Sequence, residues 1–179
     1  MKLKNIPNIL SVIRILLVFV FVWLFFALEK PYVALLIFLI AGLTDVVDGY
    51  LARRNNWVSN LGKILDPLAD KLLVCAAMIC LIETNQLPAW IVIVIISREF
   101  IISGFRLVAA DNGIVIAASM WGKVKTVCQM LMIVCLVWDL HFFWFWVLEQ
   151  ILIYLALILT VISLVDYLYK NRSVLGSDK

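Results

Sequence analysis

Charge is scarce in this 179-residue sequence, in which Asp, Glu, Lys and Arg together make up 15% of the residues and hydrophobic residues 65%. Soluble globular domains carry far more charge, so this composition excludes an ordinary soluble protein. The sequence also has only one histidine and four cysteines, none in a Cys-x-x-Cys pair, which argues against a zinc site or a disulfide framework. Internal repeats are lacking too, and we therefore expect a single domain over residues 1–179.

Long hydrophobic stretches take the place of the missing charge. Spanning about 30 Å of hydrocarbon requires roughly 20 helical residues. Six stretches approach that length, at residues 9–28, 32–51, 66–82, 87–110, 120–138 and 143–169. All four prolines fall just before one of these stretches or in its first turn, where a missing N–H does no harm. The sequence therefore predicts an all-α integral membrane protein, a bundle of six transmembrane helices with a short tail from about residue 170.

The basic residues predict how these helices are oriented. With six spans, both termini and the loops after the second and fourth helices lie on one side of the membrane. Of the 15 Lys and Arg residues, all except Lys30 lie on or nearest that side. Because basic residues accumulate on the cytoplasmic side, we expect a multi-pass protein of the cytoplasmic (inner) membrane with both termini in the cytosol.

Four aspartates gather in one part of this apolar chain, although a buried carboxylate is costly unless it is paired or binds a metal. Asp45 and Asp48 are three residues apart, so they share one face of the second helix. Asp66 and Asp70 are four apart on the third helix, and the short connection brings both faces together near the cytoplasmic surface. Ligands that are all oxygen suit Mg²⁺ or Mn²⁺ rather than Zn²⁺. Alternatively, the aspartates cap helices and pair with the nearby basic residues Arg53, Arg54, Lys63 and Lys71.

Small residues continue the first acidic face at helical spacing. Gly42, Gly49 and Ala52 would admit a ligand or a neighbouring helix to close range. Arg53 can hold a phosphate through its planar guanidinium group. The stretch GKVKT at residues 122–126 is not a P-loop, because it lacks the upstream glycine and no strand precedes it. A bound nucleotide would therefore have to be held by metal and side chains.

The aspartates belong to the pattern D-x2-D-G-x2-A-R-x8-G-x3-D-x3-D, which resembles the signature of the CDP-alcohol phosphotransferases. Its fixed positions are Asp45, Asp48, Gly49, Ala52, Arg53, Gly62, Asp66 and Asp70. The resemblance implies a six-helix membrane enzyme, usually a homodimer, in which the four aspartates bind two divalent ions and a CDP-linked donor. It also implies that Asp70 acts as the general base. The donor nucleotide would contact Asp45, Gly49, Ala52, Arg53 and Gly62.

A second cluster is basic and lies around the cytoplasmic ends of the fourth and fifth predicted helices. Its members are Arg98, Arg106, Lys123 and Lys125. The last three could instead be membrane-surface anchors, whereas Arg98 lies about two turns deeper and needs either Glu99 or a bound anion as its partner. A basic pocket opposite the metal site predicts an acceptor alcohol that itself carries a phosphate. At the other side of the membrane, Glu149 and Gln150 are expected to reach toward the headgroups, and His141 to lie at the surface.

Residues 5–15 and 97–126 resemble one branch of the family, the phosphatidylglycerophosphate synthases. This resemblance points to sn-glycerol 3-phosphate as the acceptor and CDP-diacylglycerol as the donor, with CMP leaving, in a protein embedded in the lipid bilayer and without a nucleic-acid partner. Sibling enzymes that use inositol phosphate, serine or phosphatidylglycerol are alternatives. A cation transporter is an alternative from another class, although transporters commonly place such acids near the midplane on broken helices.

Overall fold

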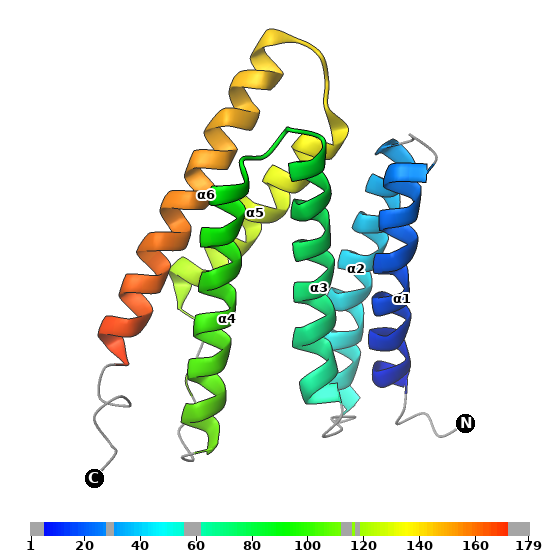
Figure 1. Ribbon diagram of the computed structural model, residues 1–179. Coiled ribbons are helices and arrows are strands. Elements are labelled where there is room, and N and C mark those ends of the chain that lie inside the picture. Colours follow the sequence, from blue (N-terminus) through cyan, green and yellow to red (C-terminus); the bar gives the residue numbers. More distant parts are fainter. Residues whose placement is uncertain (1–5, 28–30, 56–61, 112–115, 117–118, 172–179) are drawn as a thin grey trace. The chain divides into compact units, whose positions relative to one another are not determined.

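The computed structural model describes residues 6–27, 31–55, 62–111, 116 and 119–171, and all regular secondary structure in these ranges is α-helical (Figure 1). The helices are α1 (Ile6–Ala27), α2 (Pro31–Asn55), α3 (Gly62–Glu83), α4 (Ala89–Asp111), α5 (Met120–Trp138) and α6 (Phe143–Lys170). They match the six predicted helices, and the bounds of α5 are the same. The largest differences are at the end of α2 and the start of α3, each of which extends four residues further than predicted. The predicted fold class is confirmed.

One detail of the helix prediction is wrong, because Pro67 lies inside α3 rather than in its first turn. The helix begins at Gly62, so Pro67 is its sixth residue. A proline there lacks the N–H that would bond to the carbonyl one turn earlier. The other prolines of the described residues follow the prediction: Pro7 and Pro31 lie in the first turns of α1 and α2, and Pro88 directly precedes α4.

Three helical segments are long and apolar enough to cross a membrane, as judged by length and composition within the described part of the chain. They are Ile9–Ala27, Met120–Trp138 and Phe143–Lys170. A shorter apolar segment, Tyr32–Thr44, precedes Asp45 in α2. The charged residues of α2, α3 and α4 lower the hydropathy of those helices, although each has at least 22 residues. Together these helices define a multi-pass membrane protein.

The chain forms two compact units, Met1–Thr84 and Asn85–Lys179. In the first unit, α1 packs against both α2 and α3, and α2 contacts α3. Phe21 of α1 and Phe38 of α2 meet there with their ring centroids 6.0 Å apart. In the second unit, α6 packs against both α4 and α5. A single domain over residues 1–179 stays a prediction.

Small side chains allow the helices of the first unit to approach each other closely. Ala34 and Ala41 on α2, and Ala69 and Ala77 on α3, are all fully buried. Helices in a bilayer associate mainly through such close packing, because lipid tails are as apolar as the side chains they would replace. Polar side chains are buried in both units: Ser11 and Arg14 in the first, and Gln129, Thr160 and Ser163 among those in the second.

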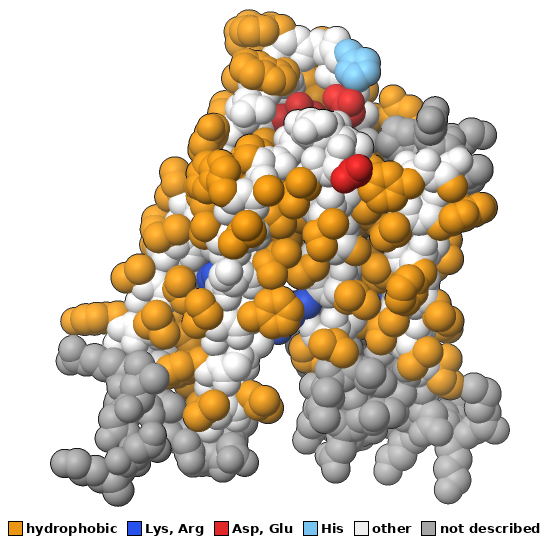
Figure 2. All heavy atoms as spheres, viewed as in Figure 1, with side chains coloured by type: hydrophobic (Ala, Val, Ile, Leu, Met, Phe, Trp, Pro, Cys, Tyr) orange, Lys and Arg blue, Asp and Glu red, His pale blue; other side chains and the backbone are white. Residues whose placement is uncertain are grey.

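The outward faces of the helices are hydrophobic. Figure 2 shows hydrophobic side chains over most of the visible face of the described residues, with few charged groups among them. Within the protein itself, only 28%, 39% and 33% of the three most apolar segments are buried. Large side chains in these segments, such as Phe19 and Trp144, are exposed. In a bilayer, lipid tails would cover this surface.

Candidate functional site

The first unit carries the four aspartates of the predicted metal site. Asp45 and Asp48 lie in the second half of α2, and Asp66 and Asp70 lie in the first three turns of α3. Asp45 is ten residues before the end of α2, and Asp70 is eight residues after the start of α3. Because a helix rises about 1.5 Å per residue, the two acidic segments lie at similar depths from the connection that joins α2 to α3.

Asp70 is the member of this set whose side chain is described: it is half-buried and has an interaction partner. The side chains of the other predicted metal and donor residues lie outside the described part of the chain. These residues are Asp45, Asp48, Gly49, Ala52, Arg53, Gly62 and Asp66. Among the side chains that the structure does describe, no group of three or more His, Cys, Asp or Glu could hold a metal ion. The four-aspartate site therefore stays a prediction.

A buried cation, Arg14, lies in the same unit. Its side chain is 0% exposed, on the helix that packs against both α2 and α3. Arg14 is eight residues after the start of α1, as Asp70 is after the start of α3. It is also 13 residues before the end of α1, whereas Asp45 is 14 residues after the start of α2. Arg14 thus lies at the depth of the aspartates, and a buried arginine requires a counter-charge.

In the second unit, three helices bring charged side chains together. Arg98 of α4 is 7% exposed, and its Nη1 donates a hydrogen bond to Glu99 Oε1 at 3.0 Å. Lys125 of α5 is 0% exposed, and its Nζ donates to the same Glu99 oxygen. The second amino group of Arg98, Nη2, donates to Ser163 Oγ of α6. Glu99 is thus the partner of Arg98, which was one of the two partners expected from the sequence. Because Lys125 is buried, the alternative that it is a membrane-surface anchor is wrong.

Among its described ion pairs, this network has more positive than negative charge. Two cations, Arg98 and Lys125, share the single carboxylate of Glu99. Buried charges are costly unless they are balanced, and the cost falls when a counter-ion of suitable geometry is present. The arrangement therefore favours binding of an anion nearby.

The first turn of α5 lies close to the same guanidinium group. Ser119 caps this helix, with its hydroxyl accepting the Gly122 N–H at 3.1 Å. A Cβ atom added at Gly122 would meet Arg98 Nη2 at 3.4 Å, so glycine leaves the room that this close approach needs. The N-terminus of a helix carries a partial positive charge. The start of α5 therefore adds to the positive potential around Arg98.

The other two predicted acceptor residues are exposed. The guanidinium carbon of Arg106 lies 6.0 Å from the centre of the Tyr167 ring, within the range of a cation–π interaction. Arg106 is eight residues, or about two turns, beyond Arg98 on α4. Lys123 lies in the first turn of α5 with its side chain exposed. The described contacts thus link Arg98 and Lys125 through Glu99, whereas Arg106 contacts Tyr167 of α6.

Sequence reasoning assigned no role to α6, yet two of its polar residues take part in these contacts. Ser163 bonds to Arg98, and the ring of Tyr167 packs edge-on against Phe105 at 5.8 Å. Ser163 and Tyr167 are four residues apart, so they share one face of the helix. Polar residues at helical spacing in an otherwise apolar span were the signal that could have identified them.

The expectation that Glu149 reaches toward the headgroups is wrong. Its side chain is buried, with 7% of the residue exposed. Glu149 shares the inward stripe of α6 with Ile153, Ala156 and Thr160, all of which are buried. The register of the helix, rather than distance from its end, thus determines where this carboxyl group lies. His141 is exposed, as expected.

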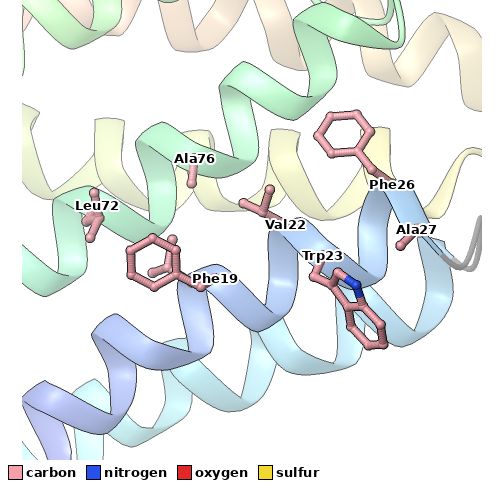
Figure 3. Close-up of a pocket in the computed structure, with 8 residues that line it drawn as sticks. Phe19, Val22, Trp23, Phe26, Ala27, Leu72 and Ala76 are labelled. Atoms are coloured by element: carbon pink, nitrogen blue, oxygen red, sulfur yellow. The ribbon is translucent and has the colours of Figure 1, made fainter.

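An apolar groove of about 500 Å³ lies between α1 and α3 (Figure 3). It is lined by Val18, Phe19, Val22, Trp23, Phe26 and Ala27 of α1 and by Leu72 and Ala76 of α3. Phe19 and Trp23 are largely exposed, so the groove opens onto the surface of the unit. Its lining is entirely hydrophobic, and it is therefore suited to an acyl chain rather than to a polar ligand.

The described residues form six helices of a membrane protein, with charged residues near the motif and in the network of α4, α5 and α6. The chain belongs to the CDP-alcohol phosphatidyltransferase family, whose sequence model matches residues 4–162. The family inferred from the aspartate motif is thereby confirmed.

Curated relatives are similar over nearly the whole chain. The CDP-diacylglycerol–glycerol-3-phosphate 3-phosphatidyltransferase of Bacillus subtilis (strain 168) is 43% identical, with 96% of this chain and 97% of the relative covered. The enzyme of the same name from Haemophilus influenzae (strain ATCC 51907) is 42% identical, with 92% and 91% covered. That of Escherichia coli (strain K12) is 38% identical, with 94% and 96% covered.

Proposed function

We propose that this protein transfers the phosphatidyl group from CDP-diacylglycerol to sn-glycerol 3-phosphate, giving phosphatidylglycerophosphate and CMP. The observation that carries the proposal is its similarity, over at least 92% of the chain, to three enzymes named for that reaction. The motif from Asp45 to Asp70 and the buried cations of the second unit support it.

The donor side of the reaction is assigned to the first unit. Two divalent ions, Mg²⁺ or Mn²⁺, are supported by the chemistry of the four aspartates, which offer oxygen ligands from two helices that contact each other. Asp45, Asp48, Asp66 and Asp70 would hold them. When bound, such ions neutralise a pyrophosphate and stabilise the leaving CMP. Gly49, Ala52 and Gly62 leave room for the nucleotide, and Arg53 pairs with a phosphate.

Asp70 is assigned the proton transfer. A hydroxyl oxygen of sn-glycerol 3-phosphate forms a bond to the phosphorus that carries the diacylglycerol. The bond from this phosphorus to the oxygen of CMP breaks, and the hydroxyl proton passes to the Asp70 carboxylate. A carboxylate is a weak base, so the proton moves as the new bond forms rather than before it. The half-buried position of Asp70 in α3 is compatible with this role.

The acceptor side is assigned to the basic residues of the second unit. Arg98, Arg106, Lys123 and Lys125 would hold the phosphate of sn-glycerol 3-phosphate. A phosphate is a suitable ligand because Arg98 and Lys125 together exceed the charge of Glu99, and the capped start of α5 lies beside Arg98. Serine and phosphatidylglycerol lack a phosphate monoester and would not use this positive charge in full.

The lipid tails of the donor are assigned to the bilayer and to the groove between α1 and α3. The groove reaches Leu72, which lies only about 3 Å further along α3 than Asp70, so an acyl chain lying in it would begin at a similar depth. The distribution of basic residues supports an active site and two termini on the cytoplasmic side. The family resemblance supports a homodimer.

The test is to give the purified protein CDP-diacylglycerol with one acceptor at a time and to measure CMP release. We expect release with sn-glycerol 3-phosphate and Mg²⁺, and only background release with inositol phosphate, serine or phosphatidylglycerol. Preference for another acceptor would assign the protein to a sibling reaction. CMP release that no acceptor stimulates would contradict the proposal and leave ion transport to be tested.

A further inference from the structure

Four polar atoms in the second unit are buried without a hydrogen-bond partner among the described residues. Two of them are carboxylate oxygens, Glu149 Oε1 and Asp166 Oδ2, and the other two can donate a hydrogen bond. One is the phenol oxygen of Tyr167, a residue that is 3% exposed. The other is Nε of Arg98, which is 7% exposed. Buried polar groups almost always have a partner, and each exception requires an explanation. Both groups can donate a hydrogen bond, so a shared acceptor would satisfy both.

Contacts between α4 and α6 bring these two residues into one region. Ser163 binds the guanidinium group of Arg98 from α6, and Tyr167 is one turn further along the same helix face. Helical side chains lean toward the N-terminus of their helix, so the phenol of Tyr167 is expected to lean over the turn that carries Ser163. The ring of Tyr167 also contacts Phe105 and lies under Arg106.

The charge of this region indicates what kind of acceptor is missing. Among the described contacts of this region, Arg98, Arg106 and Lys125 provide three cations, and Glu99 is the carboxylate that pairs with Arg98 and Lys125. Asp166, beside Tyr167, pairs through Oδ1 with Lys170 at 2.7 Å, so this pair adds no net charge, while its other carboxylate oxygen, Oδ2, is buried without a partner among the described residues. A ligand with negatively charged oxygens would satisfy the orphan donors and the excess charge together. A phosphate group has both properties.

We propose that Tyr167 is a further acceptor-binding residue, whose phenol O–H donates a hydrogen bond to the phosphate that Arg98 holds. The identity of the ligand, sn-glycerol 3-phosphate, rests on the proposed function. The existence of an anion site does not depend on it. It assigns a binding role to α6, on a residue beyond the part of the chain that matches the family's sequence model. The bound phosphate group could belong to a soluble phosphate monoester or to a lipid headgroup. We assign the site to the soluble monoester.

The first test is the variant Tyr167→Phe, which removes the hydroxyl and keeps the ring that contacts Phe105 and Arg106. We expect the KM for sn-glycerol 3-phosphate to rise about tenfold, equivalent to about 1.4 kcal/mol. The KM for CDP-diacylglycerol and kcat should stay near their original values, because the reacting groups are untouched. Tyr154→Phe is the matched control, since Tyr154 lies on the same helix and is 53% exposed. It should leave every parameter unchanged.

The second test measures binding without turnover. Inorganic phosphate and sn-glycerol 3-phosphate should raise the thermal unfolding temperature of the original protein, whereas glycerol should not. Tyr167→Phe should require about tenfold more of either anion for the same increase. An increase produced by anionic phosphatidylglycerol micelles, and not by soluble phosphate, would overturn the assignment of a soluble ligand.

The outcomes separate this inference from the proposed function. Equal dependence on phosphate in Tyr167→Phe and the original protein would overturn the role of Tyr167, and the phenol would then be a packing residue. If the original protein released no CMP with sn-glycerol 3-phosphate but showed the Tyr167-dependent phosphate effect, the proposed function would fail and the anion site would stand.

Discussion

The two units of the chain carry opposite charges at their predicted sites. The first unit carries four motif aspartates on α2 and α3 and buries one cation, Arg14, at their depth. The second unit buries two cations, Arg98 and Lys125, and balances them with one carboxylate, Glu99. In the second unit the described ion pairs set two cations against one carboxylate, and in the first unit the motif places four aspartates on helices that pack against the helix carrying Arg14. Each unit would thus be completed by a ligand of the minority sign: a cation in the first and an anion in the second.

This comparison explains how charge is tolerated in so hydrophobic a protein. A fully balanced buried network would not need a ligand, while an unbalanced one costs several kcal/mol that a ligand can offset. When no metal ion is bound, the positive charge of Arg14 would partly balance the negative charge of the aspartates. When no phosphate is bound, the negative charge of Glu99 would partly balance Arg98 and Lys125 in the same way. The following experiments test whether Arg14 and Glu99 balance these charges, and whether the proposed donor and acceptor sites are assigned correctly.

The largest expected effect is the loss of activity on removing a motif carboxylate. Asp66→Asn should lower CMP release by on the order of 10²–10³-fold, because it would remove one of the charges proposed to hold the divalent ions and pyrophosphate. CMP release at saturating Mg²⁺ is the measurement. Glu83→Gln is the control, since Glu83 is an exposed acid at the end of the same helix. Near-normal release from Asp66→Asn would remove the metal site from the first unit.

The next prediction separates the donor and acceptor sites by kinetics. Asp70→Asn should lower kcat by roughly 10²-fold while CDP-diacylglycerol still binds, because three aspartates remain. Arg98→Lys keeps a positive charge but loses the planar group that contacts both Glu99 and Ser163. It should raise the KM for sn-glycerol 3-phosphate roughly tenfold and leave the KM for the donor unchanged. If both variants raised the two KM values equally, the two sites could not be assigned separately.

In the second unit, Glu99→Gln tests the balance of charge. Removing the shared carboxylate leaves two buried cations uncompensated and should lower the free energy of unfolding by about 3–5 kcal/mol. Added phosphate should then stabilise this variant more than it stabilises the original protein. Thermal unfolding in detergent with increasing phosphate is the measurement. An unchanged response to phosphate would mean that the anion does not interact with these cations.

In the first unit, Arg14→Gln is the corresponding experiment with opposite signs. In the presence of a chelator, this variant should have a free energy of unfolding about 2–4 kcal/mol lower than that of the original protein. The reason is that no buried cation would then offset the repulsion among the aspartates. Mg²⁺ should restore part of the loss. If chelator and Mg²⁺ gave the same unfolding temperature in this variant, Arg14 would not act on the aspartates.

Much of the fold could be predicted from the sequence because long apolar stretches and prolines mark helices strongly. The family followed from eight residues at fixed spacing. Contacts that depend on helix register were harder to predict. Lys125 lies only five residues after the start of α5, a typical position for a surface anchor, yet the helix turns it into the protein. Glu149 was misplaced for the same reason.

The role of α6 was missed for a different reason. The hydrogen bond between Arg98 and Ser163 joins residues 65 apart in sequence. No local pattern encodes that distance, since it depends on which helices pack together. The sequence could indicate that Arg98 needed a partner, because a buried arginine is costly, and it offered Glu99 as one candidate. Only the packing of α4 against α6 could reveal the second partner.

The smallest expected effect concerns the groove between α1 and α3. Ala76→Trp should fill part of its volume of about 500 Å³ with an indole ring. If an acyl chain of the donor lies there, the KM for long-chain CDP-diacylglycerol should rise by about three- to tenfold, because part of the apolar burial of that chain is lost. A short-chain donor that does not reach the groove should be unaffected, and so should the KM for sn-glycerol 3-phosphate. The ratio of the two donor KM values is therefore the measurement. An unchanged ratio would place the acyl chains elsewhere on the hydrophobic surface of the protein, and the first unit would then contribute only its charged end to donor binding.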